Sequence, residues 1–131
     1  MTDRQIVLIV DDRGQQNWRE YFTPEDVLLH TSRPDEALAA LRSNPRVDLA
    51  LINLNGPVDD SLSLLASLRA LRRPEETVVG LCLDGTDGDA ASQAYAAAAD
   101  ELLTRPLHPA LLPHQLEKLR NLSRLHRRQA E

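Results

Sequence analysis

The chain has 131 residues, of which 42% are apolar, 27% charged and 3% aromatic, and its formal net charge is −5. This length suits one domain with its own hydrophobic core, and the composition excludes a disordered chain. The acidic balance disfavours nucleic acid as a partner, and the apolar runs are too short to span a membrane. No signal peptide opens the chain, so we expect a cytoplasmic protein, and its single cysteine, Cys82, excludes an internal disulfide.

Short apolar runs alternate with helical patterns along the whole chain. The expected strands cover residues 5–10, 27–30, 47–52, 77–83 and 101–104. The expected helices cover a short segment around 15–22, then 35–43, 61–71, an alanine-rich segment that ends near 98, and a long segment from about 109. In the first of these helices, Trp18 and Phe22 are expected on the buried side. This order predicts one α/β domain over 1–131, a doubly wound five-stranded parallel sheet with helices on both faces.

Polar residues stand where three of the predicted strands end. The first strand is followed by Asp11 and Asp12, the third by Asn53 and the fifth by Arg105. Because sites in such sheets lie at the carboxyl ends of the strands, these side chains should share one cleft. Two adjacent carboxylates favour a hard cation such as Mg²⁺, although they could equally be solvated aspartates at the start of a loop.

Three segments in this order resemble receiver domains of two-component response regulators, the CheY-like family. They are Leu-Ile-Val-Asp-Asp at 8–12, the segment 48–57 with Asp60-Ser61, and the segment 99–107 with its Arg-Pro pair. The resemblance covers nearly the whole chain and implies a flavodoxin-like sheet in the strand order 2-1-3-4-5. It also implies that Asp11, Asp12 and the main-chain carbonyl of Asn55 form the metal site. Arg105 takes the place of a lysine that precedes a cis-proline in that family.

The chain departs from the family at the residues that would handle phosphate. Asn53 replaces the phospho-acceptor aspartate, Leu102 replaces the aromatic switch residue, and the switch threonine or serine corresponds to Cys82 or to Leu83, depending on the direction of counting. A carboxamide is too poor a nucleophile to form an acyl phosphate. Losing one carboxylate should weaken a magnesium site, and the planar fork of Arg105 is not equivalent to a lysine. We therefore expect no required cofactor and at most weak Mg²⁺ binding.

These departures predict a pseudo-receiver, a phosphorylation-independent interaction or dimerisation module that is not an enzyme. The pattern is similar to the degenerate adaptor receiver of receiver-receiver-diguanylate cyclase response regulators, which implies a C-terminal effector domain such as a diguanylate cyclase. One alternative is a conventional phosphorelay receiver switch, phosphorylated on another acid such as Asp59 or Asp60. A small α/β enzyme is a further alternative, but the segment after the first strand has no glycine-rich phosphate loop. Cys82 is expected in the core rather than as a reactive thiol.

The final helix places leucines three or four residues apart. Leu122 and Leu125 should lie beyond the edge of the sheet, whereas Arg120, Arg124, Arg127 and Arg128 should keep the remaining surface in water. We expect a homodimer, or pairing with another receiver domain, through the fourth helix, fifth strand and fifth helix. Alternatively, the stripe is the inner face of a monomer whose last turns fray. The helix ends without a stop signal, which suggests a linker to a missing C-terminal domain.

Overall fold

The computed structural model describes residues 4–14, 16–85 and 88–130. Five parallel strands form one sheet in the order β2-β1-β3-β4-β5, which confirms the predicted α/β fold and strand order. The strands are β1 (Ile6–Asp11), β2 (Val27–Thr31), β3 (Leu49–Asn53), β4 (Val78–Asp84) and β5 (Glu101–Arg105). Each lies within two residues of the run that predicted it, because short β-branched and leucine-rich runs suit strands that are covered on both faces.

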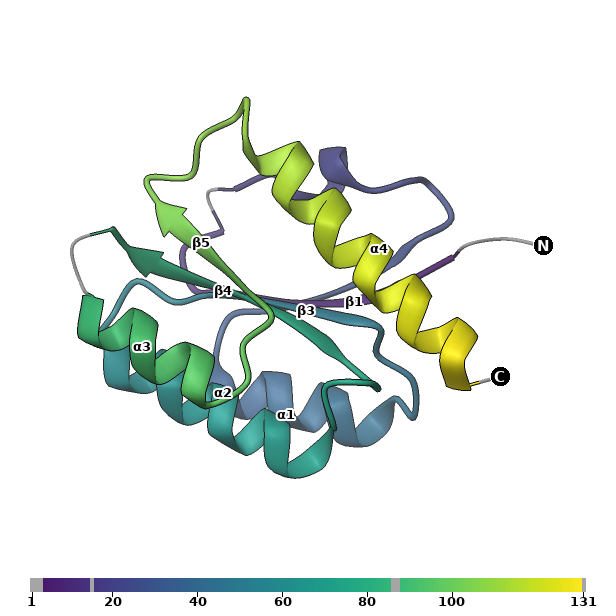
Figure 1. Cartoon of the computed structure of the whole chain (residues 1–131), viewed down its shortest axis with the longest axis horizontal. Coiled ribbons are helices and arrows are strands. Elements are labelled where there is room, and N and C mark those ends of the chain that lie inside the picture. Colours follow the sequence, from purple (N-terminus) through teal and green to yellow (C-terminus); the bar gives the residue numbers. More distant parts are fainter. Residues whose placement is uncertain (1–3, 15, 86–87, 131) are drawn as a thin grey trace.

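Helices cover both faces of the sheet (Figure 1). They are the 3₁₀ turn η1 (Trp18–Tyr21) and the α-helices α1 (Pro34–Ser43), α2 (Val58–Leu71), α3 (Gly88–Ala96) and α4 (Leu112–Ala130). Figure 1 shows α1, α2 and α3 on one face and α4 on the other. No helix in the described residues is long and apolar enough to cross a membrane.

Two apolar clusters separate these layers, because successive strand residues point to opposite faces. Leu8 and Val10 of β1 pack in the cluster beneath α1, α2 and α3. Val7 and Ile9 of the same strand pack in the second cluster, with η1 and the first half of α4. The central strands are therefore almost completely buried, and their polar ends emerge only at the two edges of the sheet.

The first crossover differs from the prediction of a helix around 15–22. It contains the four-residue turn η1, and residue 15 lies outside the described residues. Gly14, at φ 62°, turns the chain immediately before this segment, and Thr23-Pro24 follows it, so little room remains for a longer helix. Trp18 and Phe22 are buried as predicted, at 1% and 9% exposure.

The start of α4 and the environment of one arginine also differ from expectation. The helix begins at Leu112 rather than near residue 109. Arg120, predicted to face water, is buried and forms an ion pair with the buried carboxylate of Asp26 at 3.3 Å. Its Nε also donates to Oε1 of Gln5 at 3.2 Å, and its guanidinium lies over the ring of Phe22. Arg120 is buried because these partners meet it at the amino edge of the sheet, whereas Arg128 is exposed as expected.

Candidate functional site

The polar residues predicted to converge do meet at the carboxyl edge of the sheet. Strand register places Asp11 of β1 beside Asn53 of β3, and Asp84 of β4 beside Arg105 of β5. A cavity of about 200 Å³ at this edge, which we call the carboxyl cleft, is lined by Asp11, Asn53, Asn55 and Arg105. The parallel register of the sheet thus brings the ends of β1, β3 and β5 to one cleft.

The guanidinium of Arg105 is the centre of this cleft. Its Nη1 donates to the Leu54 carbonyl oxygen at 2.7 Å, to Asn53 Oδ1 at 3.1 Å and to Asn55 Oδ1 at 3.4 Å. Its Nε forms an ion pair with Asp84 Oδ1 at 3.2 Å. The peptide bond to Pro106 is cis, as the resemblance implied. Arg105 therefore connects the carboxyl ends of β3, β4 and β5 through one side chain.

The carboxylate of Asp11 is held by groups of the first crossover. Its Oδ2 accepts a hydrogen bond from Trp18 Nε1 at 2.9 Å. Its Oδ1 accepts from the main-chain amides of Arg13 and Gly14 at 3.2 and 3.1 Å. Both oxygens are therefore engaged in fixing the turn that leads into η1.

The carboxylate of Asp12 is held by Asn55. The Asn55 main-chain amide donates to Asp12 Oδ2 at 3.0 Å, and the Asn55 side-chain amide donates to Oδ1 at 2.8 Å. Burial by itself raises the pKa of Asp12, but these hydrogen bonds outweigh it, so the pKa is lowered. Asp12 consequently remains ionised at neutral pH and ties the loop after β1 to the loop after β3.

These residues do not fit a bound Mg²⁺ in the arrangement observed. All four oxygens of Asp11 and Asp12 accept hydrogen bonds from the protein, and the third position of the site carries the neutral Asn53. The positive charge of Arg105 lies in the same cleft and opposes a second cation. Among the described residues no three carboxylate, imidazole or thiol groups are placed to share a metal ion. Weak Mg²⁺ binding stays a prediction.

The predicted switch positions are all apolar or buried. Cys82 is fully buried in the cluster under α4, and burial raises the pKa of its thiol to about 12, so it is a core residue. Leu83 points to the opposite cluster, and Leu102 is half-buried against that cluster. None of these three side chains has a hydroxyl group that could bind a phosphoryl oxygen.

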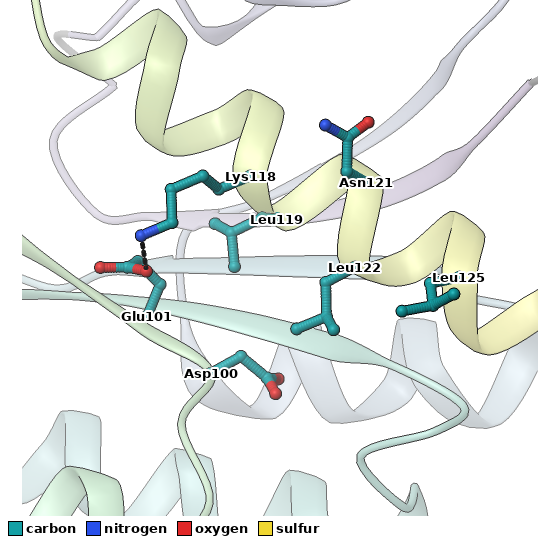
Figure 2. Close-up of a pocket in the computed structure, with 7 residues that line it drawn as sticks. All are labelled: Asp100, Glu101, Lys118, Leu119, Asn121, Leu122 and Leu125. Atoms are coloured by element: carbon teal, nitrogen blue, oxygen red, sulfur yellow. Dashed lines mark ion pairs between the residues drawn. The ribbon is translucent and has the colours of Figure 1, made fainter.

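Leu122 and Leu125 line a second cavity, of about 440 Å³, between β5 and α4 (Figure 2). Leu125 is 49% exposed, as expected for a residue beyond the sheet. Leu122 is half-buried and packs against the cluster under α4, so the expectation that its own domain leaves it uncovered is wrong. The helix crosses the sheet farther along its length than the leucine spacing alone indicated.

Two residues that bond to side chains of the carboxyl cleft, Asp84 and Trp18, were not predicted as site residues. Asp84 was expected after the fourth strand rather than in it, although a carboxylate at a strand end is a signal for this edge of the sheet. Trp18 was expected to be buried, but its hydrogen bond to Asp11 could not be foreseen, because the bond depends on the compact turn in the first crossover.

Comparison with known proteins agrees with this fold. No family model matches the chain, and no curated protein matches it in sequence. The signal receiver domain of an HD domain-containing protein from Pseudomonas fluorescens Pf-5 is similar, with 22% identity, a TM-score of 0.79, and coverage of 98% of this chain and 95% of that one. Chemotaxis response regulator CheY4 of Vibrio cholerae is similar at 21% identity and a TM-score of 0.74, covering 88% and 98%.

A two-component system response regulator/GGDEF domain protein is similar at 23% identity and a TM-score of 0.72, over 89% of this chain. This chain spans about half the length of that protein, 51%. The fold is therefore that of a CheY-like response-regulator receiver domain. Asn53 is the residue at the end of β3 in this fold, beside Asp11 and within hydrogen-bond distance of Arg105.

Proposed function

We propose that this chain is a pseudo-receiver, a receiver-like module of two-component signalling that makes protein contacts without being phosphorylated. The observation that carries this proposal is the hydrogen bond from Arg105 to the Asn53 carboxamide, in a cleft that contains no carboxylate at the end of β3. A carboxamide oxygen is a weak nucleophile, and here it already accepts a hydrogen bond from the guanidinium of Arg105. The module requires neither a metal ion nor enzymatic activity.

The cleft is also held together without phosphate. Arg105 bonds to the end of β3 through Asn53 and the Leu54 carbonyl, and it pairs with Asp84 at the end of β4. A guanidinium can serve several acceptors at once, whereas an ammonium is a compact point charge. These bonds keep the ends of the three strands in one arrangement, so the surface that the module presents does not depend on a phosphoryl group.

A conventional switch that uses Asp59 or Asp60 receives little support. Both residues are exposed in the first turn of α2. Within the described residues, Arg105 bonds to Asn53, Asn55 and Asp84 and to neither of these acids. A phosphoryl group on Asp59 or Asp60 would lie in water. It would not be bonded to the residues at the ends of β4 and β5.

The proposed partner is a domain of the same signalling system. The similar GGDEF domain protein combines a response regulator with a second domain, which makes a C-terminal effector such as a diguanylate cyclase a reasonable partner. A second receiver-like domain, contacting α3, β5 and α4, is the other partner that we propose. Both contacts would use surfaces away from the carboxyl cleft.

The proposal can be tested with beryllofluoride, a phosphoryl analogue that binds receiver carboxylates, added with Mg²⁺ during amide NMR. We expect no saturable shift in the amides of β3, β4, β5 or α4. The double variant Asn53→Asp, Arg105→Lys, which restores an acceptor carboxylate and a compact cation, is the matched control and should shift. Saturable shifts at the strand ends of the wild type would contradict the proposal.

A further inference from the structure

Arginines gather at the amino edge of the sheet, at the opposite ends of the strands from the carboxyl cleft. The strands β1 and β3 begin at this edge, and the helices α1 and α4 end there. Figure 1 shows the start of β1 and the end of α4 on the same side of the molecule. We call this region the amino-edge basic surface and define it by six residues: Arg4, Arg42, Arg46, Arg72, Arg127 and Arg128. It is strongly basic in a chain whose net charge is −5.

Hydrogen bonds and ion pairs connect these arginines across the edge. Arg72 donates to main-chain carbonyls just after α1, at 2.6 and 3.4 Å. Arg46, which follows that segment, donates through Nη2 to the main-chain carbonyl of Arg4 at 2.7 Å and pairs with Asp48 at 2.9 Å. The Nε of Arg127 lies 3.9 Å from the same carboxylate. The surface therefore extends from the end of α1, past β1 and β3, to the end of α4.

Most of the positive charge on this surface is not neutralised by the domain itself. Among the described residues, Asp48 is the one carboxylate that forms ion pairs with these arginines, and its side chain is only 3% exposed. Arg4, Arg42 and Arg128 are exposed, and their side chains form no hydrogen bond or ion pair with the rest of the described chain. Three guanidinium groups are therefore available to a partner.

Helix dipoles explain only part of this accumulation of charge. Cations are favoured in the last turn of a helix, which is where Arg42, Arg127 and Arg128 lie. Arg4 and Arg46, however, precede strands, and strands have only small net dipoles. The charge therefore exceeds what the helix ends favour, and an exposed patch of one sign attracts a partner of the opposite sign.

Acidic residues on both sides of the surface restrict the kind of anion that it can bind. Glu25 is exposed before β2, and Glu75 is exposed before β4. Because β2 and β4 lie on either side of β1 and β3, these carboxylates flank the surface along the edge of the sheet. A nucleic acid or an anionic membrane presents continuous negative charge and would meet both of them, whereas a short acidic segment fits between them.

We propose that the amino-edge basic surface binds a short acidic segment of a partner protein. Carboxylates of this segment pair with the exposed guanidinium groups, whose planar forks can bind a carboxylate through two parallel hydrogen bonds. Exposed ion pairs are screened by salt, so the contact is weak and depends on ionic strength. The surface lies at the far ends of the strands from Asn53 and Arg105. The inference therefore does not rest on the proposed function.

Fluorescence anisotropy of a fluorescein-labelled hexaglutamate peptide, titrated with the full chain at low ionic strength, tests this contact. The wild type should bind saturably, and binding should weaken as salt is added. The double variant Arg42→Glu, Arg128→Glu should raise the dissociation constant by about ten-fold or more, because each substitution replaces an attraction with a repulsion.

The double variant Arg13→Glu, Arg33→Glu is the matched control. It makes the same change in net charge with two exposed arginines at the carboxyl edge, so it should change the dissociation constant by less than about two-fold. A wild type that does not bind hexaglutamate, or equal effects of the two double variants, would overturn the proposal.

Titrations with a labelled hexathymidylate strand and with phosphatidylserine vesicles distinguish an acidic segment from other anions. Neither should bind more tightly than hexaglutamate, because both meet the carboxylates that flank the surface. Tighter binding of the strand would reject the acidic segment in favour of a nucleic acid, and tighter binding of the vesicles would reject it in favour of a membrane.

Discussion

Arg105 shows how one side chain can connect the ends of three strands. Its Nη1 reaches three oxygen acceptors at the end of β3, and its Nε reaches Asp84 at the end of β4. The Arg105 side chain is only 15% exposed, so its bonds to Asn53 and Leu54 are shielded from water, whereas Asp84 is 75% exposed and its ion pair contributes little. The buried hydrogen bonds are therefore the part of this arrangement that fixes the cleft.

Asn53→Asp should bind Mg²⁺ more tightly than the wild type, because it restores the third carboxylate. One additional carboxylate at about 4 Å from a divalent cation contributes roughly 2 kcal/mol even in water, so affinity should rise by about ten-fold or more. Arg105 would pair with the new carboxylate, and adding Arg105→Ala should increase the gain. Fluorescence of Trp18, the single tryptophan, reports the titration because its indole donates to Asp11. Asn121→Asp is the control, and equal affinities throughout would mean that these aspartates form no metal site.

On the scale of secondary-structure elements, α4 is attached to the sheet by charge as well as by leucines. Arg120 pairs with Asp26, whose side chain is fully buried before β2, and Ser123 Oγ donates to the Asp48 carbonyl before β3. Asp26 also accepts from the main-chain amides of Gln5 and Thr23. This network closes the amino edge of the sheet, opposite the carboxyl cleft.

Asp26→Asn should destabilise the protein by roughly 3 to 5 kcal/mol at neutral pH, because it leaves Arg120 buried beside a neutral group. Burial alone raises the pKa of Asp26, but the amides of Gln5 and Thr23 and the charge of Arg120 outweigh it, so the folded pKa lies below the ordinary 3.8. The stabilisation by the ionised Asp26 carboxylate is therefore complete above pH 3.8. It is lost as the pH falls through the lower pKa of Asp26 in the folded state.

Urea unfolding from pH 7 to pH 3 measures how much the Asp26 carboxylate contributes to the free energy of unfolding. The stability difference between wild type and Asp26→Asn should shrink toward acidic pH. Asp35→Asn is the control, because its ion pair with Arg33 is largely exposed and should change stability by less than about 1 kcal/mol. A constant difference between wild type and Asp26→Asn across this range would show that Asp26 titrates alike in both states.

The sequence predicts an element well when neighbouring residues determine it, and poorly when its contacts come from residues distant in sequence. The five strands follow from apolar runs, and the meeting of Asp11, Asn53 and Arg105 follows from parallel topology. The turn η1 and the burial of Arg120 depend on partners that are distant in sequence. The leucine spacing of α4 placed Arg120 on the solvent-facing side of the helix. Spacing alone cannot reveal that Asp26 and Gln5 contact this side.

In the whole molecule, α4 has two roles. Its first half covers the sheet together with η1, and its second half lines the cavity between β5 and α4. The carboxyl cleft lies at the opposite ends of the strands, where Arg105 connects β3 to β5. A protein contact at the cavity between β5 and α4 would leave the bonds of Arg105 unchanged, as the proposed phosphorylation-independent module requires.

The most direct test of whether this domain accepts a phosphoryl group is the intact mass of the wild-type protein after incubation with acetyl phosphate and Mg²⁺. We predict no added phosphoryl group, because Asn53 cannot form an acyl phosphate and its carboxamide oxygen accepts a hydrogen bond from Arg105. The double variant Asn53→Asp, Arg105→Lys serves as the positive control. A stoichiometric phosphoryl adduct on the wild type that hydroxylamine removes would contradict the account.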